Sequence, residues 1–316
     1  MDLEYLLWLQ NWREATNNFL TPFMQGCSDL AVGVLFIVPI FIYWCVNKKS
    51  GLFLMLCYMI SEWINGLAKL IVCAYRPWIR DARIIPPGNA MKSAGGYSFP
   101  SGHTMEATPI LGGLTVLYHK KSFLVPLVCG LAILTIAFSR NYLGVHTPQD
   151  VVCGVIFALA SVWLATKIFS YLEKNSDKEN LFLILSVIIS ALALVYVEFK
   201  SYPMDYNAKG KLIVNPVPMT RQAYRDFGMI LGFAVSRFIE KRFIKFSPTG
   251  FKSRGFIIAL IGLVIWYFCF IRINFYHVMR DTFLGVHWGY CTAGFIMVFY
   301  FVCAWPFVIK KLGVRS

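Results

Sequence analysis

The recurrence of long apolar runs is the feature that most constrains how this chain folds. From residue 28 to the C-terminus, runs of about 17 to 22 residues recur, each long enough to cross roughly 30 Å of hydrocarbon as a helix. Of the 316 residues, 58% are hydrophobic and 15% are charged, whereas ordinary soluble domains carry about one quarter charged residues. The sequence therefore predicts an all-α, polytopic membrane helix bundle that is surrounded by membrane lipids.

Nine membrane helices are expected from these runs. They lie near residues 29–46, 51–72, 103–118, 122–138, 149–171, 180–199, 224–240, 255–273 and 287–309. Residues 1–27 lack the basic start and apolar core of a cleaved signal peptide, and we expect them to form an interfacial amphipathic segment. A core membrane domain is then expected over residues 28–199, followed by additional membrane helices over residues 200–316.

Basic residues lie mainly in short loops on one side of the expected helices. They comprise Lys48, Lys49, Lys120, Lys121, the stretch 241–254, Lys310, Lys311 and Arg315. The positive-inside rule makes that side cytoplasmic, and this arrangement accounts for the net charge of +14 without a nucleic-acid partner. The loops over 73–101, 139–147 and 200–223, and the loop around Arg280, then face outward.

Lys69 and Arg76 form the first group of candidate site residues. Lys69 lies near the outward end of a membrane helix, where an ionisable side chain is costly and marks a functional candidate, although snorkelling to the interface explains it equally well. Pro77 favours an extended backbone at Arg76 and ends the helix. The guanidinium is then placed in the loop, where it can hold phosphate oxygens bidentately.

Pro100, Ser101, Gly102 and His103 stand immediately before an apolar helix. Ser101 can cap this helix, and Gly102 allows a phosphate to approach the backbone donors and the positive end of the helix dipole. A plain loop with a cap is the alternative. His103 can protonate a leaving oxygen, or it can be an ordinary interfacial histidine.

Ser139 and Arg140 are followed by His146 and, four residues later, by Asp150. Thr147 and Asp150 also fit the N-cap and third positions of a helix, so a capping role for Asp150 is expected as well. The two roles are compatible. A carboxylate one helical turn beyond His146 can fix the ring tautomer and leave the other nitrogen free to attack phosphorus.

The three loops together carry the groups that phosphoryl transfer requires. Cations neutralise the equatorial oxygens of the phosphate, and an acid serves the leaving group. The sequence has no dense cluster of Asp or Glu for magnesium, and its histidines lack zinc-like spacing. We therefore expect a reaction that uses no metal and no other cofactor.

In order and spacing, these segments resemble the three-part signature of the type 2 phosphatidic acid phosphatase superfamily. The matching segments are Lys69 to Pro77, Pro100 to His103 and Ser139 to Asp150. The resemblance implies a six-helix phosphatase core with its site at the outer or lumenal membrane surface. It assigns catalysis to three residues, with His146 forming a phosphohistidine, Asp150 supporting it, and His103 acting as general acid and later helping to activate water.

The same resemblance implies that Lys69, Arg76, Ser101, Gly102 and Arg140 bind the phosphate. The substrates it implies are lipid phosphates or pyrophosphates, namely phosphatidate, phosphatidylglycerol phosphate, polyprenyl pyrophosphate or sphingoid phosphates. The nine-helix layout also resembles glucose-6-phosphatase, which leaves a sugar phosphate as an alternative substrate.

Other functions remain open from the sequence. A phosphotransferase would pass the phosphoryl group to a sugar or lipid hydroxyl, and an anion or lipid transporter would release no phosphate. Vanadate-dependent haloperoxidases share the signature, but they are soluble and fit this hydrophobic chain poorly. We expect a bacterial plasma-membrane protein with its site facing outward, or an endoplasmic-reticulum protein with a lumenal site in a eukaryotic cell.

A repeated four-residue sequence and one long outward loop each allow two interpretations. Leu143–His146 and Leu284–His287 both read Leu-Gly-Val-His, which indicates either a decayed repeat or chance similarity. The second copy has Tyr290 and Cys291 near the place of the aspartate, so we do not expect His287 to be a nucleophile. Loop 201–220 either covers the substrate or is a solvated connector.

Overall fold

The chain is helical throughout the described residues. The computed structural model describes residues 1–33, 35–92, 94–250, 253–272 and 285–313. Across these ranges every regular element is a helix, and the one β contact is an isolated bridge between Tyr206 and Leu212. The predicted all-α class is therefore confirmed. The loop around Arg280 lies outside the described residues.

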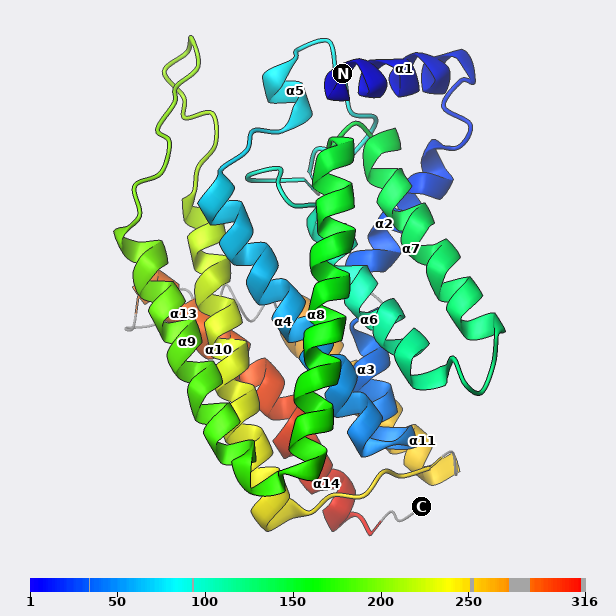
Figure 1. The fold of residues 1–316 in the computed structure, drawn as a ribbon, viewed down its shortest axis with the longest axis vertical. Coiled ribbons are helices and arrows are strands. Elements are labelled where there is room, and N and C mark those ends of the chain that lie inside the picture. Colours follow the sequence, from blue (N-terminus) through cyan, green and yellow to red (C-terminus); the bar gives the residue numbers. More distant parts are fainter. Residues whose placement is uncertain (34, 93, 251–252, 273–284, 314–316) are drawn as a thin grey trace. The chain divides into compact units, whose positions relative to one another are not determined.

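The α-helices appear in Figure 1. They are α1 (Asp2–Ala15), α2 (Thr21–Gly33), α3 (Ile37–Phe41), α4 (Lys48–Val72), α5 (Pro77–Arg80), α6 (Gly102–Tyr118), α7 (Leu124–Tyr142), α8 (Pro148–Lys174), α9 (Glu179–Phe199), α10 (Val217–Ile239), α11 (Ser253–Trp266), α13 (Gly285–Phe299) and α14 (Trp305–Lys311). The short helices of other type are η1 (Ile42–Val46), η2 (Ser176–Lys178), η3 (Glu240–Ile244), η4 (Tyr267–Arg272) and η5 (Tyr300–Ala304).

Several of these helices can cross a membrane. Five described spans are long and apolar enough, namely Lys48–Arg80, Leu124–Tyr142, Pro148–Lys174, Ser176–Phe199 and Gly285–Lys311. The broken pair Thr21–Val32 and Ile37–Val46 gives a sixth if it counts as one span. Helices lie in all nine expected ranges, but three of these helices do not meet this test within the described residues. Helix α6 has only 17 residues, α10 carries four charged side chains, and the apolar helix Arg254–Cys269 is too short.

The described residues form two compact units. The first comprises Met1–Phe36, Ile60–Leu164 and Ser201–Met219, and the second comprises Ile37–Met59, Ala165–Lys200 and Thr220–Ser316. The three signature segments all fall in the first unit. The expected division into a core membrane domain over residues 28–199 and additional membrane helices over residues 200–316 stays a prediction.

In the first unit, α2, α6 and α7 pack against one another and α1 contacts α7 (Figure 1). The amphipathic α1 buries Leu6 and Leu9 against Ile84, a residue of the loop that follows α5. Buried Arg13 donates hydrogen bonds to the carbonyl oxygens of Ile85 at 2.8 Å and Tyr142 at 3.1 Å. Helix α1 therefore ties this loop to the end of α7, only a few residues before His146.

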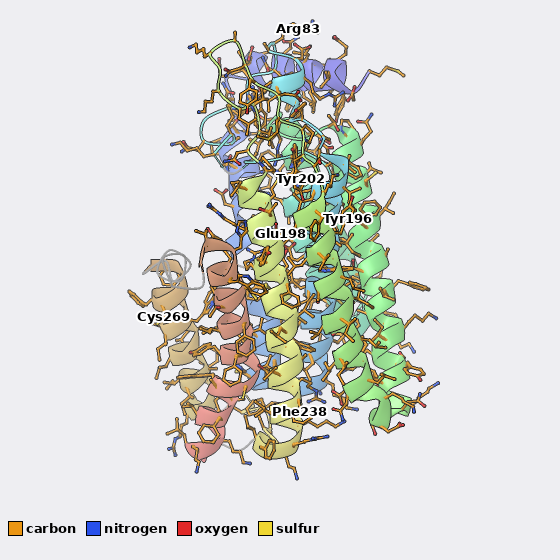
Figure 2. All side chains as sticks on the ribbon, turned by 90° about the vertical axis from the view of Figure 1, so that its left-hand side faces the viewer. Arg83, Tyr196, Glu198, Tyr202, Phe238 and Cys269 are labelled. Carbon is orange, nitrogen blue, oxygen red and sulfur yellow. The ribbon has the colours of Figure 1, made fainter. Side chains whose placement is uncertain are left out.

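In the second unit, close helix packing depends on glycine. A Cβ added at Gly228 of α10 would lie 1.9 Å from the carbonyl oxygen of Cys291 in α13. Small residues at such contacts let membrane helices approach closely. Only 22% of the most apolar window of Ser176–Phe199 is buried, so the outer surface of α9 suits lipid. Figure 2 labels Tyr196 and Glu198 near the C-terminal end of α9, and Phe238 near the C-terminal end of α10.

Candidate active site

The candidate residues are gathered inside the first unit, and almost all of them are buried. The buried ones are Lys69, Arg76, Ser101, His103, Arg140, His146 and Asp150, while Gly102 is half-buried. Such a concentration of ionisable side chains inside an apolar chain is costly unless they pair with one another or bind a charged ligand.

His146 follows α7 in a short loop that its neighbours hold rigidly. The side-chain amide of Asn141 donates to the His146 carbonyl oxygen at 2.9 Å. On the ring, Nε2 lies 2.8 Å from Nη1 of Arg76. A guanidinium nitrogen can only donate, so Nε2 must accept and the ring hydrogen lies on Nδ1. The lone pair of Nε2 therefore faces the cation that the sequence assigned to phosphate.

Asp150 caps α8 and lies beside the His146 ring. Its Oδ2 accepts the Thr147 N–H at 2.9 Å, and the Thr147 hydroxyl accepts the Asp150 N–H at 3.3 Å, which is a reciprocal capping box at the start of α8. The same Oδ2 lies 3.4 Å from Nδ1 of His146. The helix cap thus holds the carboxylate beside the ring nitrogen that carries the hydrogen.

Arg76 is fixed by backbone carbonyl groups. The residue is extended, with φ of −65° and ψ of 152°, and Pro77 begins α5 as the sequence predicts. Its Nε donates to Gly96 at 3.1 Å, its Nη2 to Gly95 at 2.8 Å and its Nη1 to Val145 at 3.1 Å. These bonds hold the guanidinium against the His146 ring.

Lys69 points into the protein instead of snorkelling to the surface. Its Nζ donates to the carbonyl oxygens of Pro100 at 2.6 Å and Tyr97 at 3.4 Å. The side chain thereby joins the first signature segment to the second. An ammonium group has three donors, so one N–H is left for a ligand.

Arg140 has donors that the protein does not use. Its Nη1 donates to the Ser28 hydroxyl, but within the described structure its buried Nε and Nη2 atoms have no hydrogen-bond partner. An unsatisfied buried donor costs about 1 to 3 kcal/mol, and more when the group is charged. Donors of this kind on one guanidinium can hydrogen-bond to the oxygens of an anion. The Ser139 hydroxyl, in contrast, donates to its own helix at Ile136.

The second signature segment begins α6 at Gly102. The Ser101 side chain does not cap the helix as expected, because its Oγ accepts a hydrogen bond from the Thr104 hydroxyl at 2.9 Å. The Ser101 N–H instead donates to the Asp150 carbonyl oxygen at 3.0 Å, which links the second segment to the third. A Cβ added at Gly154 of α8 would lie 3.3 Å from the Ser101 carbonyl oxygen, a tight contact that glycine avoids.

The second segment therefore lies directly against the start of α8. His103 occupies the first turn of α6 and is buried. Its predicted role as the proton donor to the leaving oxygen stays a prediction.

The segment 201–219, which ends in the first turn of α10, packs onto the segment that fixes Arg76. Met219 Sδ accepts the Tyr97 N–H at 3.2 Å, and a Cβ added at Gly96 would lie 2.6 Å from this sulfur. The Tyr75 hydroxyl also bonds to Asp205 of the loop. The sequence offered no signal for this contact, because Met219 follows Gly96 by more than one hundred residues and belongs to no motif.

Replacing Met219 by alanine should lower kcat/KM by about tenfold, because a loosened Gly96–Tyr97 segment holds Arg76 less well and small displacements of catalytic groups are costly. Met219→Leu, which keeps most of the volume, should stay near the wild type. Phosphate release by both purified variants checks this. Equal activity of Met219→Ala and the wild type would contradict the role of the loop.

The electrostatic surroundings of His146 favour the neutral ring. Burial lowers the pKa of His146 well below its ordinary value, and the nearby cations Arg76, Arg140 and Lys69 shift it in the same direction. The neutral form, which carries the nucleophilic lone pair, therefore persists as the pH falls through about 6.5 and is lost only at lower pH.

The acid limb of kcat/KM should accordingly lie below about pH 6.5, because this limb reports the essential base of the free enzyme. Phosphate release measured from about pH 4.5 to 8, corrected for titration of the substrate phosphate itself, checks this. If the midpoint of the corrected acid limb lay above the ordinary histidine pKa of about 6.5, His146 would not be held in its neutral form.

Comparison with known proteins places this site in a family. Several apolar helices and a buried cationic site define a multi-pass membrane protein with the groups for phosphoryl transfer. Residues 50–174 match the family model of the PAP2 superfamily. This match, which covers less than half of the chain, confirms the resemblance seen in the sequence.

Several curated proteins are similar to part of this chain. Phosphatidylglycerophosphatase B of Bacillus subtilis is 26% identical over 148 residues, covering 44% of this chain and 68% of that protein. Undecaprenyl-diphosphatase of Sulfolobus acidocaldarius is 26% identical over 126 residues, covering 39% of this chain and 57% of that protein. Bacitracin transport permease protein BcrC of Bacillus licheniformis is 28% identical over 158 residues, covering 48% of this chain and 70% of that protein.

No solved structure gives a significant match to the chain. The family match and the phosphatase names of the first two relatives support a phosphate ester hydrolase. The helices after residue 174 lie outside the family match.

Proposed function

We propose that this protein is a membrane phosphatase that hydrolyses a lipid phosphate or lipid pyrophosphate through a phosphohistidine on His146, without a metal. The observation that carries the proposal is the juxtaposition of the Nε2 lone pair of His146 with Arg76, together with an Arg140 whose buried Nε and Nη2 have no hydrogen-bond partner in the described part of the chain. A phosphate supplies the acceptors that Arg140 needs and the phosphorus that Nε2 attacks.

The reaction then has two steps. In the first, Nε2 of His146 attacks phosphorus, the bond between phosphorus and the leaving oxygen breaks, and His103 gives its proton to that oxygen. For this attack, Nη1 of Arg76 must turn from Nε2 to a phosphate oxygen. In the second step, a water attacks the phosphohistidine, His103 takes the water proton, and the nitrogen–phosphorus bond breaks to release phosphate.

The residues in the site perform the tasks that a metal performs in other phosphatases. Lys69, Arg76 and Arg140 neutralise the charge on the equatorial oxygens, and the start of α6 at Gly102 adds backbone donors with Ser101 beside them. Asp150 stabilises the imidazolium character of the ring after attack. Histidine itself is the nucleophile, so no metal-bound hydroxide is required.

A lipid substrate is favoured by the setting of the site and by the relatives. Lys69, Arg140 and Asp150 lie near the ends of helices α4, α7 and α8, which belong to spans long and apolar enough to cross a membrane. Lipid headgroups lie at the ends of such spans. Two relatives are named for phosphatidylglycerol phosphate and undecaprenyl diphosphate substrates. By the positive-inside rule the site faces outward, on a core over residues 28–199 with helices 200–316 added.

Phosphate release by the detergent-purified protein tests the proposal. With a chelator present, the substrates compared are phosphatidate, phosphatidylglycerol phosphate, a polyprenyl pyrophosphate, a sphingoid phosphate and glucose 6-phosphate. Chelator-resistant release from a lipid supports the proposal. Transfer of the phosphoryl group to an added sugar or lipid hydroxyl identifies a phosphotransferase, and anion flux into vesicles without phosphate release identifies a transporter.

A further inference from the structure

Ser98 stands outside the three signature segments, yet it lies at the centre of their contacts. It is buried, and its N–H donates to the Ala74 carbonyl oxygen at 2.7 Å, which fixes it beside the chain that leads to Arg76. Its hydroxyl donates to Oδ2 of Asp150 at 2.6 Å. The same hydroxyl oxygen lies 3.5 Å from Nδ1 of His146.

Asp150 is therefore held from two directions. The Thr147 N–H reaches Oδ2 at 2.9 Å from within the capping box, and the Ser98 hydroxyl reaches the same oxygen from the opposite loop. The capping box alone leaves the carboxylate free to rotate about its side-chain bonds. A second donor on the same oxygen restricts this rotation and keeps Oδ2 at 3.4 Å from Nδ1 of His146.

We propose that Ser98 is a positioning residue of the reaction, whose hydroxyl holds the Asp150 carboxylate in the orientation that receives the Nδ1 hydrogen of His146. This inference rests on the proposed function. It adds a residue of the loop before Pro100 to the support of the nucleophile.

The hydroxyl matters most after the attack on phosphorus. At that point Nε2 is bonded to phosphorus and Nδ1 keeps its hydrogen, so the ring carries positive charge beside Oδ2 of Asp150. A carboxylate held in place stabilises this charge without first having to reorient. Substrate binding, in contrast, depends on the cations and the backbone donors, which Ser98 does not contact through its side chain.

The expected result for Ser98→Ala is a kcat lower by about 10- to 100-fold with KM within about threefold of the wild type, the size of effect typical of groups that orient a reacting residue. Ser98→Thr, which keeps the hydroxyl, should recover most of the activity. Ser98→Cys keeps the volume but donates weakly, and it should behave like alanine. Ser161→Ala is the matched control, because this buried hydroxyl donates to Phe157 of its own helix at 2.9 Å.

A double-mutant cycle with Asp150→Asn separates positioning from general stability. If Ser98 acts through Asp150, Ser98→Ala should lower kcat in the wild type and have almost no effect in the Asp150→Asn protein. Equal effects in both backgrounds, or wild-type kcat in Ser98→Ala, would overturn the inference. If Ser98→Ala does not fold, Ser98→Cys replaces it in the same double-mutant cycle, with the same expected result.

Failure of the proposed function gives a different pattern. In that case His146→Ala retains phosphate release, whatever the Ser98 variants do. Loss of activity in His146→Ala together with an inert Ser98→Ala overturns only the role of Ser98.

Discussion

Replacing His146 by alanine will abolish phosphate release, with kcat lower by about 10⁴-fold or more, because the variant has no nucleophile and removal of a nucleophile costs this much in other covalent enzymes. The folded structure should survive. Within the described structure the ring contacts Arg76, Ser98 and Asp150, and Arg76 keeps three backbone carbonyl acceptors without it.

The matched control is His119→Ala. This histidine is exposed, and its one hydrogen bond within the described structure is to the nearby carbonyl oxygen of Val116. Its removal should therefore leave kcat unchanged. Phosphate release from a lipid phosphate in detergent, measured for both variants, makes the comparison. Turnover by His146→Ala within tenfold of the wild type would rule out the histidine mechanism.

The second large effect is expected at Arg140. Arg140→Ala should lower kcat/KM by about 10³-fold, because it removes the two buried nitrogens that have no hydrogen-bond partner among the described residues and that we assign to the phosphate. Arg140→Lys should recover only part of this loss, since an ammonium group lacks the planar donors of a guanidinium. Inhibition by inorganic phosphate should weaken in parallel, which separates binding from chemistry.

Arg254→Ala provides the control for the loss of a positive charge. Arg254 is exposed in the second unit, and among the described residues its one hydrogen bond is a long contact of 3.4 Å to the Leu312 carbonyl oxygen. Its removal should change neither kcat/KM nor phosphate inhibition. An Arg140→Ala protein that kept the wild-type affinity for inorganic phosphate would show that its unpaired nitrogens do not face the ligand.

Local sequence rules predicted the parts of the site that depend on nearby residues. The extended backbone at Arg76 follows from Pro77, and the capping box follows from the spacing of Thr147 and Asp150. The helices themselves follow from apolar runs that match the hydrocarbon thickness. In each case the responsible residues lie within one helical run or one turn of each other.

Contacts between distant segments could not be predicted in this way. The acceptors of Lys69 and Arg76 are backbone carbonyl groups, which every residue has, so no residue type marked Gly95, Gly96 or Pro100 as their partners. The Ser98 hydroxyl was missed because a serine in a loop is ordinary.

Competition between hydrogen bonds explains the one local expectation that failed. Ser101 stands at the N-cap position, but its side chain pairs with Thr104 instead of capping α6. Sequence alone does not decide between two such partners.

The possible repeat was not resolved by these contacts. Leu284 lies outside the described residues, while His287 has its Nε2 3.4 Å from the Thr220 hydroxyl and packs against the Tyr224 ring. Its exclusion as a nucleophile stays a prediction.

The most direct test of the central claim is to trap the phosphoenzyme. The purified protein is mixed with a lipid phosphate labelled on the terminal phosphoryl group, in the presence of chelator, and is quenched in alkali within the first turnover. The account predicts label on the peptide that contains His146, stable in alkali and lost in acid, and absent from His146→Ala. Turnover without label on that peptide, or label on another residue, would contradict it.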